Sequence, residues 1–272
     1  MNMTKVLLVS ICMAMTLFAH AEKETPFMFS IWPSRYTQIP GDDNYKKFYG
    51  DDWSVYGLHL APGIGVAENV YGLDVGCLTL TGKTMNGLQI GGLAAICNKV
   101  NGVQIGGLAA ISYKVNGVQI GYYPMNFKGE VNGVQVGGGA IAGGNGAGVK
   151  GFQFGAGGAV ANYISGVQIG GEGALAIEGD VNGVQLSGIA SGVYKGTLRG
   201  VQLSGVYSGA TALKGLQIGA VNYIGNDFCG VQIGVVNISL DENKDSNKLQ
   251  IGLINYMKSA AVKCLPIVNM SF

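Results

Sequence analysis

The sequence predicts an all-β repeat protein, a parallel β-solenoid of about 14 coils with about 15 residues in each coil. Three observations predict this fold. A Gly-Val-Gln-Ile-Gly motif, or a close relative of it, returns at nearly constant spacing along most of the chain. The apolar–Gln–apolar segment of the motif has the two-residue period of an extended strand. Glycine supplies 47 of the 272 residues, which lets neighbouring backbones approach closely.

The glutamine of each motif marks the repeat. Eleven glutamines share this phase: Gln89, Gln104, Gln119, Gln135, Gln153, Gln168, Gln185, Gln202, Gln217, Gln232 and Gln250. Degenerate copies precede them around His59 and Asp74, and one follows at Ile267. Stacked coils would place these side chains in an amide ladder. The same row could instead form a flat, ligand-facing polar surface, so both interpretations stay open.

A second regularity concerns the apolar residue two positions before the first glycine, such as Val115 before Gly117. It is out of phase with the two apolar residues that flank the glutamine, such as Val118 and Ile120. We therefore expect the chain to bend or bulge at the glycine, so that apolar residues on both sides of it point into the core. Glycine and alanine would fill the rest of a narrow core.

An outer-membrane antiparallel β-barrel is the alternative fold. Each repeat would then be one membrane-crossing strand, with valine and isoleucine facing lipid and glutamine and glycine facing the lumen. Val268, Met270 and Phe272 alternate as the last strand of such a barrel does. Against a barrel, aromatic residues are sparse within the array, and odd and even repeats look alike although barrel turns face different compartments.

The first 54 residues do not share the repeat. Residues 1–21 are predicted to be a secretory signal peptide, because Lys5 precedes an apolar run and Ala19-His20-Ala21 forms a small-x-small cleavage site. Residues 22–54 are predicted to be an N-terminal capping segment. Residues 55–272 form the Gly-rich array, ending in a C-terminal cap with Pro266.

Few residues carry candidate chemistry. Asp241, Asn243 and Asp245 alternate as in the first half of a calcium loop, but the expected glycine and glutamate are missing, so a solvated insertion is favoured. The acidic pairs Asp42-Asp43 and Asp51-Asp52 are interpreted as solvated turns. Because His59 is the one histidine after the predicted cleavage site, a zinc site or a Ser-His-Asp set is not expected. We predict no enzyme activity and no cofactor.

Composition narrows the partners. The net charge is +1, only 12% of residues are charged, and no basic stripe interleaves with aromatic residues, so no nucleic-acid partner is expected. The four cysteines after the signal lie at different phases of the repeat. They are interpreted as small buried side chains, with a single disulfide as the alternative.

The chain resembles the bacterial surface-repeat proteins of spirochaetes and other Gram-negative groups. The residues that carry the resemblance are 55–58, 70–76, the Gly-Val-Gln-Ile-Gly series, 249–255 and 265–269. The resemblance implies an exported protein of the outer membrane or cell surface. The sequence does not identify the partner, and envelope components and a host surface ligand are the candidates. It brings no catalytic residues. The chain departs from the family's Leu-Val/Ile-Asn by placing glycine and alanine after many motifs. We expect a structural or binding protein with a repetitive β face; a pore or anchor would follow from the barrel.

Overall fold

The structure, a computed structural model, describes residues 24–30, 53–144, 146–243 and 246–271. The chain forms two compact units, Met1–Ser112 and Tyr113–Phe272, and each is described by itself. The predicted signal peptide at 1–21 lies outside the described residues, as do residues 31–52 of the predicted N-terminal segment.

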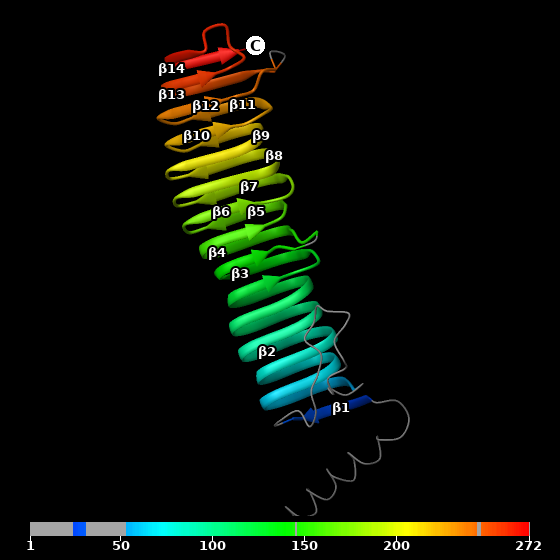
Figure 1. Ribbon diagram of the computed structural model, residues 1–272. Coiled ribbons are helices and arrows are strands. Elements are labelled where there is room, and N and C mark those ends of the chain that lie inside the picture. Colours follow the sequence, from blue (N-terminus) through cyan, green and yellow to red (C-terminus); the bar gives the residue numbers. More distant parts are fainter. Residues whose placement is uncertain (1–23, 31–52, 145, 244–245, 272) are drawn as a thin grey trace, which may run out of the picture. The chain divides into compact units, whose positions relative to one another are not determined.

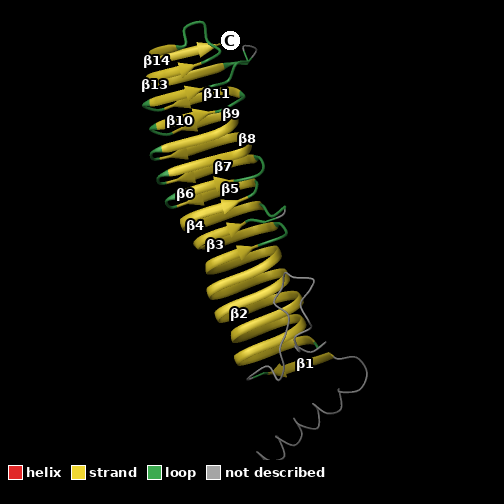
Figure 2. Ribbon diagram, in the orientation of Figure 1, coloured by secondary structure: helices red, strands yellow, loops and turns green. Residues whose placement is uncertain are grey.

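The described residues are built from strands (Figures 1 and 2). The strands are β1 (Glu24–Phe29), β2 (Ser54–Asn126), β3 (Val131–Ala142), β4 (Val149–Ala161), β5 (Ile164–Gly170), β6 (Gly173–Ala176), β7 (Val181–Ser187), β8 (Ala190–Ser204), β9 (Tyr207–Ile218), β10 (Val221–Ile224), β11 (Phe228–Ile233), β12 (Val236–Ser239), β13 (Lys248–Met257) and β14 (Cys264–Ser271). No helix among these residues is long and apolar enough to cross a bilayer.

In the second unit each coil has two walls. β5 and β6 form one coil; β5 pairs in parallel with β7 of the next coil, and β6 pairs in parallel with β8. The register places each glutamine beside the glutamine of the next coil, with steps of 15 to 18 residues. The predicted parallel β-solenoid, with one repeat in each coil, is therefore confirmed (Figure 2).

In the first unit the part of β2 from Ser54 to Ser112 winds through successive coils at a step of 15 residues, as the hydrogen bonds from Gln104 to Gln89 and from Gln89 to Asp74 record. β1 adds a further parallel rung, with Met28 in register with His59. β1 falls within the segment predicted from sequence as a cap, at residues 22–54.

The barrel alternative is wrong, because the described strands of successive coils pair in parallel, whereas barrel strands alternate in direction. The exception is β14, which turns back and pairs antiparallel with β13. A strand running in the opposite direction ends the parallel coil pattern. The pore or anchor function was inferred from a barrel alone and has no support from this fold.

One detail of the predicted core is also wrong. Val115 and Gln119 point inward and are fully buried, whereas Val118 and Ile120 point outward, and Ile120 is 39% exposed. The chain therefore alternates without interruption through Gly117, whose φ of 137° suits glycine alone. A Cβ on Gly133 would lie 2.1 Å from the Gly117 carbonyl oxygen of the coil before. Glycine thus preserves the strand, where a bend had been expected.

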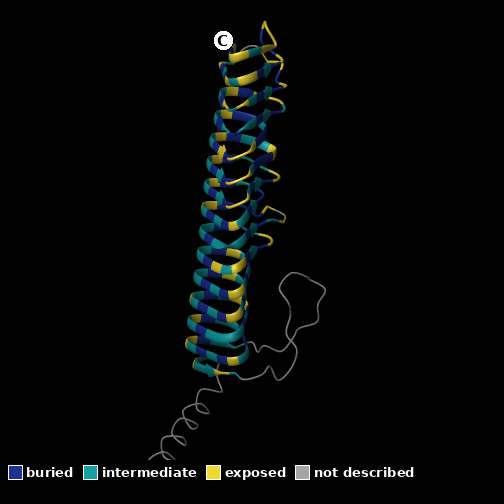
Figure 3. Cartoon of the chain, turned by 90° about the vertical axis from the view of Figure 1, so that its left-hand side faces the viewer, coloured by how far each residue is buried: buried dark blue, intermediate teal, exposed yellow. Residues whose placement is uncertain are grey.

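The opposite wall supplies small inward side chains. Ala174 and Ala176 of β6 are fully buried, as are Ala159 and Ala161 of β4. This agrees with the expected narrow core of glycine and alanine. Buried and exposed residues alternate along each coil (Figure 3). The four described cysteines are free: Cys97 is buried, Cys77 is partly exposed, and Cys229 and Cys264 are exposed.

Candidate functional site

The most regular polar feature is the glutamine row, and it lies inside the coils. In the second unit each Nε2 donates to the Oε1 of the preceding glutamine at 2.7–2.9 Å, from Gln135 to Gln250. In the first unit Gln104 donates to Gln89 at 3.0 Å. All eleven are fully buried: Gln89, Gln104, Gln119, Gln135, Gln153, Gln168, Gln185, Gln202, Gln217, Gln232 and Gln250. The ligand-facing interpretation of this row is therefore wrong, and the stacked amide ladder describes it.

The glutamine amides also join the two walls of a coil. Gln168 Nε2 donates to the carbonyl oxygens of Ala159 and Leu175, both at 3.1 Å. Small alanines opposite leave the room that the amide needs. Since a buried amide without partners costs about 1–3 kcal/mol, these bonds are what allow glutamine to be buried at this position. The row holds the coils in register and leaves no exposed amide for a ligand.

A second amide row was not predicted from sequence. Asn222 Nδ2 donates to Asn237 Oδ1, and Asn237 Nδ2 donates to Asn255 Oδ1, both at 2.7 Å. Its donors run towards later coils, whereas those of the glutamine row run towards earlier coils. The sequence contained a signal for this second row. An apolar residue followed by asparagine comes after the motif in each of these three coils, as in the Leu-Val/Ile-Asn pattern of the surface-repeat proteins.

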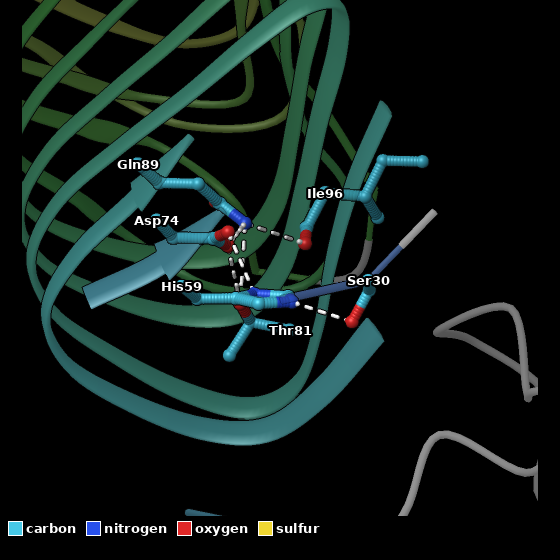
Figure 4. Close-up of polar contacts among 6 residues, drawn as sticks. All are labelled: Ser30, His59, Asp74, Thr81, Gln89 and Ile96. Carbon is cyan, nitrogen blue, oxygen red and sulfur yellow. Dashed lines mark hydrogen bonds and ion pairs between the residues drawn. The ribbon is translucent and has the colours of Figure 1, made fainter. Parts of the chain in front are cut away.

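The first unit carries a polar cluster at the start of its glutamine row (Figure 4). His59 and Asp74 occupy glutamine positions and are fully buried. Asp74 Oδ2 accepts hydrogen bonds from Gln89 Nε2 at 3.2 Å and Thr81 Oγ1 at 3.3 Å, while Asp74 Oδ1 lies 2.9 Å from His59 Nδ1. On its other side, His59 Nε2 lies 3.1 Å from Ser30 Oγ. This cluster is the candidate functional site of the chain.

Ser30, His59 and Asp74 lie in the order of an acyl-transfer triad. A Ser-His-Asp set was not expected, because sequence reasoning could not place Ser30 one rung from His59. Two details separate the cluster from working triads. The Nδ1–H of His59 is not aligned on Asp74 Oδ1, so their contact is an ion-pair distance without a directed hydrogen bond. The Ser30 N–H, a common oxyanion-hole donor, is bound to the Leu60 carbonyl at 2.9 Å. The arrangement therefore fits the terminus of a polar row.

Asp241, the first of the predicted calcium-loop residues, belongs to an internal ion pair. Asp241 Oδ2 lies 2.8 Å from Lys248 Nζ, and both side chains are buried. Asp241 also accepts the backbone N–H groups of Phe228 at 2.8 Å and Asn243 at 2.7 Å. The Lys248 ammonium group thus neutralises the Asp241 carboxylate, in the place that a bound metal cation would take. Asp245, the third residue of the weak metal candidate, lies outside the described residues.

Lys248 occupies a glycine position of the repeat, since it is in register with Gly230. Its side chain points inward, and its Nζ also donates to Ser259 Oγ at 3.0 Å. Among the residues that the structure describes, no three or more His, Cys, Asp or Glu side chains form a metal-binding group. The acidic pairs Asp42-Asp43 and Asp51-Asp52 lie outside that part of the chain.

No family model, no curated protein and no solved structure matches the chain. The resemblance to surface-repeat proteins therefore stays a prediction, and function is inferred from the chain's own geometry.

Proposed function

We propose that the chain is an exported protein of the outer envelope or cell surface, with a structural and binding role in which its repetitive β face contacts a partner. One observation carries the proposal. The two apolar residues that flank each buried glutamine point outward, as Val167 and Ile169 do in β5 and Val184 and Leu186 do in β7.

The register turns these residues into rows. Val167 pairs with Val184, and Ile169 pairs with Leu186. The same chemistry continues to Val201 and Leu203 of β8. Sheets with one solvated face usually place polar residues outside and apolar residues inside. The glutamine strand departs from this in part, because its glutamine lies inside and the two aliphatic neighbours of that glutamine lie outside. These rows are partly exposed, and Leu203 is 42% exposed. Contiguous apolar surface that reaches solvent is typical of an interaction site.

The interior supports a structural role. Each coil is bonded to the next by a parallel backbone ladder and by one buried amide. The Ser30–His59–Asp74 cluster ends this system and does not present a free oxyanion donor at Ser30. We therefore propose no catalytic role for it. The location is supported by the predicted signal peptide and by the residues that resemble surface-repeat proteins.

Export can be tested directly by expressing the full chain in a Gram-negative host. We expect a mature protein that begins at Glu22, fractionates with the envelope and is cleaved by added protease in intact cells. Leu8→Arg, which interrupts the apolar run of the predicted signal, is the matched control and should remain uncleaved in the cytoplasm. An uncleaved, protease-protected wild-type chain would contradict the proposal.

A further inference from the structure

One edge of the second unit is apolar through its last five glutamine-bearing coils. This apolar edge is the turn after each glutamine strand together with the first residue of the opposite wall. Its large side chains are 41–69% exposed: Ile189, Val206, Tyr207, Val235, Leu253 and Ile254. The segments 186–190, 203–207, 218–222, 233–237 and 251–255 contain no Asp, Glu, Lys or Arg. The edge is therefore both strongly exposed and uncharged.

The opposite edge of the same coils is different. Its turns carry exposed charged residues, among them Lys195, Asp227 and Glu242. Lys258 lies on this side as well and pairs with Glu242. The coils are thus amphipathic from edge to edge. A polar solvent on one side and an apolar medium on the other would satisfy both edges.

Backbone N–H groups in the turns of the apolar edge are hydrogen-bonded to the neighbouring coil, as an apolar medium requires. The N–H of Val206 donates to the carbonyl of Ile189 at 3.0 Å, and the N–H of Val221 donates to Val206 at 2.8 Å. The N–H of Val235 donates to Ala220 at 2.9 Å, and that of Ile254 donates to Val235 at 3.0 Å. In lipid every unpaired backbone group costs several kcal/mol. Here the turns bond from coil to coil, so they can leave water.

We propose that this edge docks on a lipid bilayer, with its side chains at the boundary between headgroups and acyl chains. The inference deepens the proposed function and rests on it, since it names a membrane surface as the partner. Apolar side chains at such a boundary reach about 5–10 Å into the bilayer. Tyr207 has the amphipathic ring that is common at this depth. Because the edge has no Lys or Arg, docking requires no anionic lipid.

A lipid surface fits this edge better than a second copy of the chain. The edge is a ridge with one or two large exposed side chains in four of its five coils, separated by glycines such as Gly205 and Gly234. A stable protein interface needs about 800 Å² on each partner and close shape complementarity. A bilayer adapts to a ridge without either requirement. β14 adds Ile267, 69% exposed and in register with Gly252, at the same edge.

Vesicle flotation with the purified mature chain tests the proposal independently of export. The probe is a vesicle of phosphatidylcholine alone, at roughly 0.1 M and 1 M salt, where screening lengths are about 10 Å and 3 Å. We expect the protein to float at both salt concentrations. Val206→Glu and Leu253→Glu should each lower the partition coefficient at least about tenfold, because a charge replaces buried aliphatic carbon. Leu240→Glu is the matched control: Leu240 is 39% exposed in a turn of the opposite edge, and its variant should float as the wild type does.

Three results would overturn the proposal. The wild-type chain could stay at the bottom of the gradient. It could float only with anionic vesicles at low salt, which would assign binding to charges elsewhere. It could fail to float while sedimentation velocity shows an oligomer that Val206→Glu and Leu253→Glu dissociate, which would assign the edge to a second copy. Circular dichroism of each variant shows that the coils are intact. Failure of flotation with normal export would leave the proposed envelope function standing.

Discussion

Two regions bury charged or titratable side chains among the stacked coils, and they do so in different ways. One is the start of the glutamine row in the first unit, and the other is the last coil of the second unit. In the first unit, His59 and Asp74 replace glutamine within the row itself. In the second unit the glutamine row continues to Gln250, and the charge enters at a glycine position, as Lys248 paired with Asp241. All four charged or titratable side chains are at most 3% exposed.

A stacked interior accepts charged side chains only at certain positions. A glutamine amide both donates and accepts, so it can repeat without limit, whereas a carboxylate only accepts and an ammonium only donates. Two like charges stacked about 5 Å apart would repel by about 3 kcal/mol at an effective dielectric constant near 20. Charged residues therefore occur where a row starts or a coil array ends, and each is paired with the opposite type.

The largest expected effect is at the Lys248–Asp241 pair. Lys248→Met should lower the free energy of unfolding by about 3–5 kcal/mol, because it leaves the Asp241 carboxylate buried without its ammonium partner. Urea unfolding followed by circular dichroism measures the change. Adding Asp241→Asn should recover part of the loss, since the buried charge is then removed.

The control for this prediction is the exposed pair of Lys258 and Glu242. Lys258→Met should leave the unfolding midpoint unchanged, because solvent screens that pair. If Lys248→Met were equally silent, the buried pair would not hold the last coil, and the comparison between the two regions would fail.

The second prediction compares a glutamine in the middle of the row with the last one. Gln202 donates to Gln185 and accepts from Gln217, whereas Gln250 donates to Gln232 and accepts from no described side chain. Gln202→Leu should cost about 2–4 kcal/mol of unfolding free energy, and Gln250→Leu should cost about half as much, because fewer partners are left unpaired. Equal costs in urea unfolding would contradict a ladder whose members depend on their neighbours.

Much of the fold could be predicted from sequence, since the period of the glutamines fixes the coil and the odd–even likeness fixes its parallel direction. The direction of the side chains could not. The apolar–Gln–apolar pattern predicts that glutamine and valine point to opposite faces of the strand. Hydrophobicity alone would place the valine face in the core, but the structure places the glutamine there. Only the contacts across a coil, such as Gln168 with Ala159, show that the narrow interior accepts an amide.

The Ser30–His59–Asp74 cluster could not be predicted from sequence for a different reason. Ser30 and His59 are 29 residues apart, and most of the intervening residues lie outside the repeat. No period therefore relates the two residues, and only the pairing of β1 with β2 brings them together. The Lys248–Asp241 pair was recoverable in part. Lys248 stands where every earlier motif has glycine, and an inward lysine requires a carboxylate nearby.

The third prediction asks whether the His59–Asp74 pair is more than the end of a row. In His59→Gln with Asp74→Gln, two more amides extend the ladder, so the unfolding free energy should stay within about 1 kcal/mol of the wild type. Asp74→Leu alone is the contrasting variant, and it should destabilise strongly because Thr81 and Gln89 lose their acceptor and His59 loses its carboxylate neighbour. A double variant as unstable as Asp74→Leu would show that the His59–Asp74 pair itself holds the first coils.

The smallest effect concerns the cysteines, which compare a buried thiol of the first unit with an exposed thiol of the second unit. Burial raises the pKa of the Cys97 thiol in the first unit to about 12, while Cys229 in the second unit is exposed. Near pH 8 iodoacetamide should therefore modify Cys229 and leave Cys97 intact, because the thiolate is the reacting species. Mass spectrometry of the folded chain, followed by modification in urea, separates the two residues. Rapid modification of Cys97 in the folded chain would mean that the coils around it open more readily than the buried amide row of this unit allows.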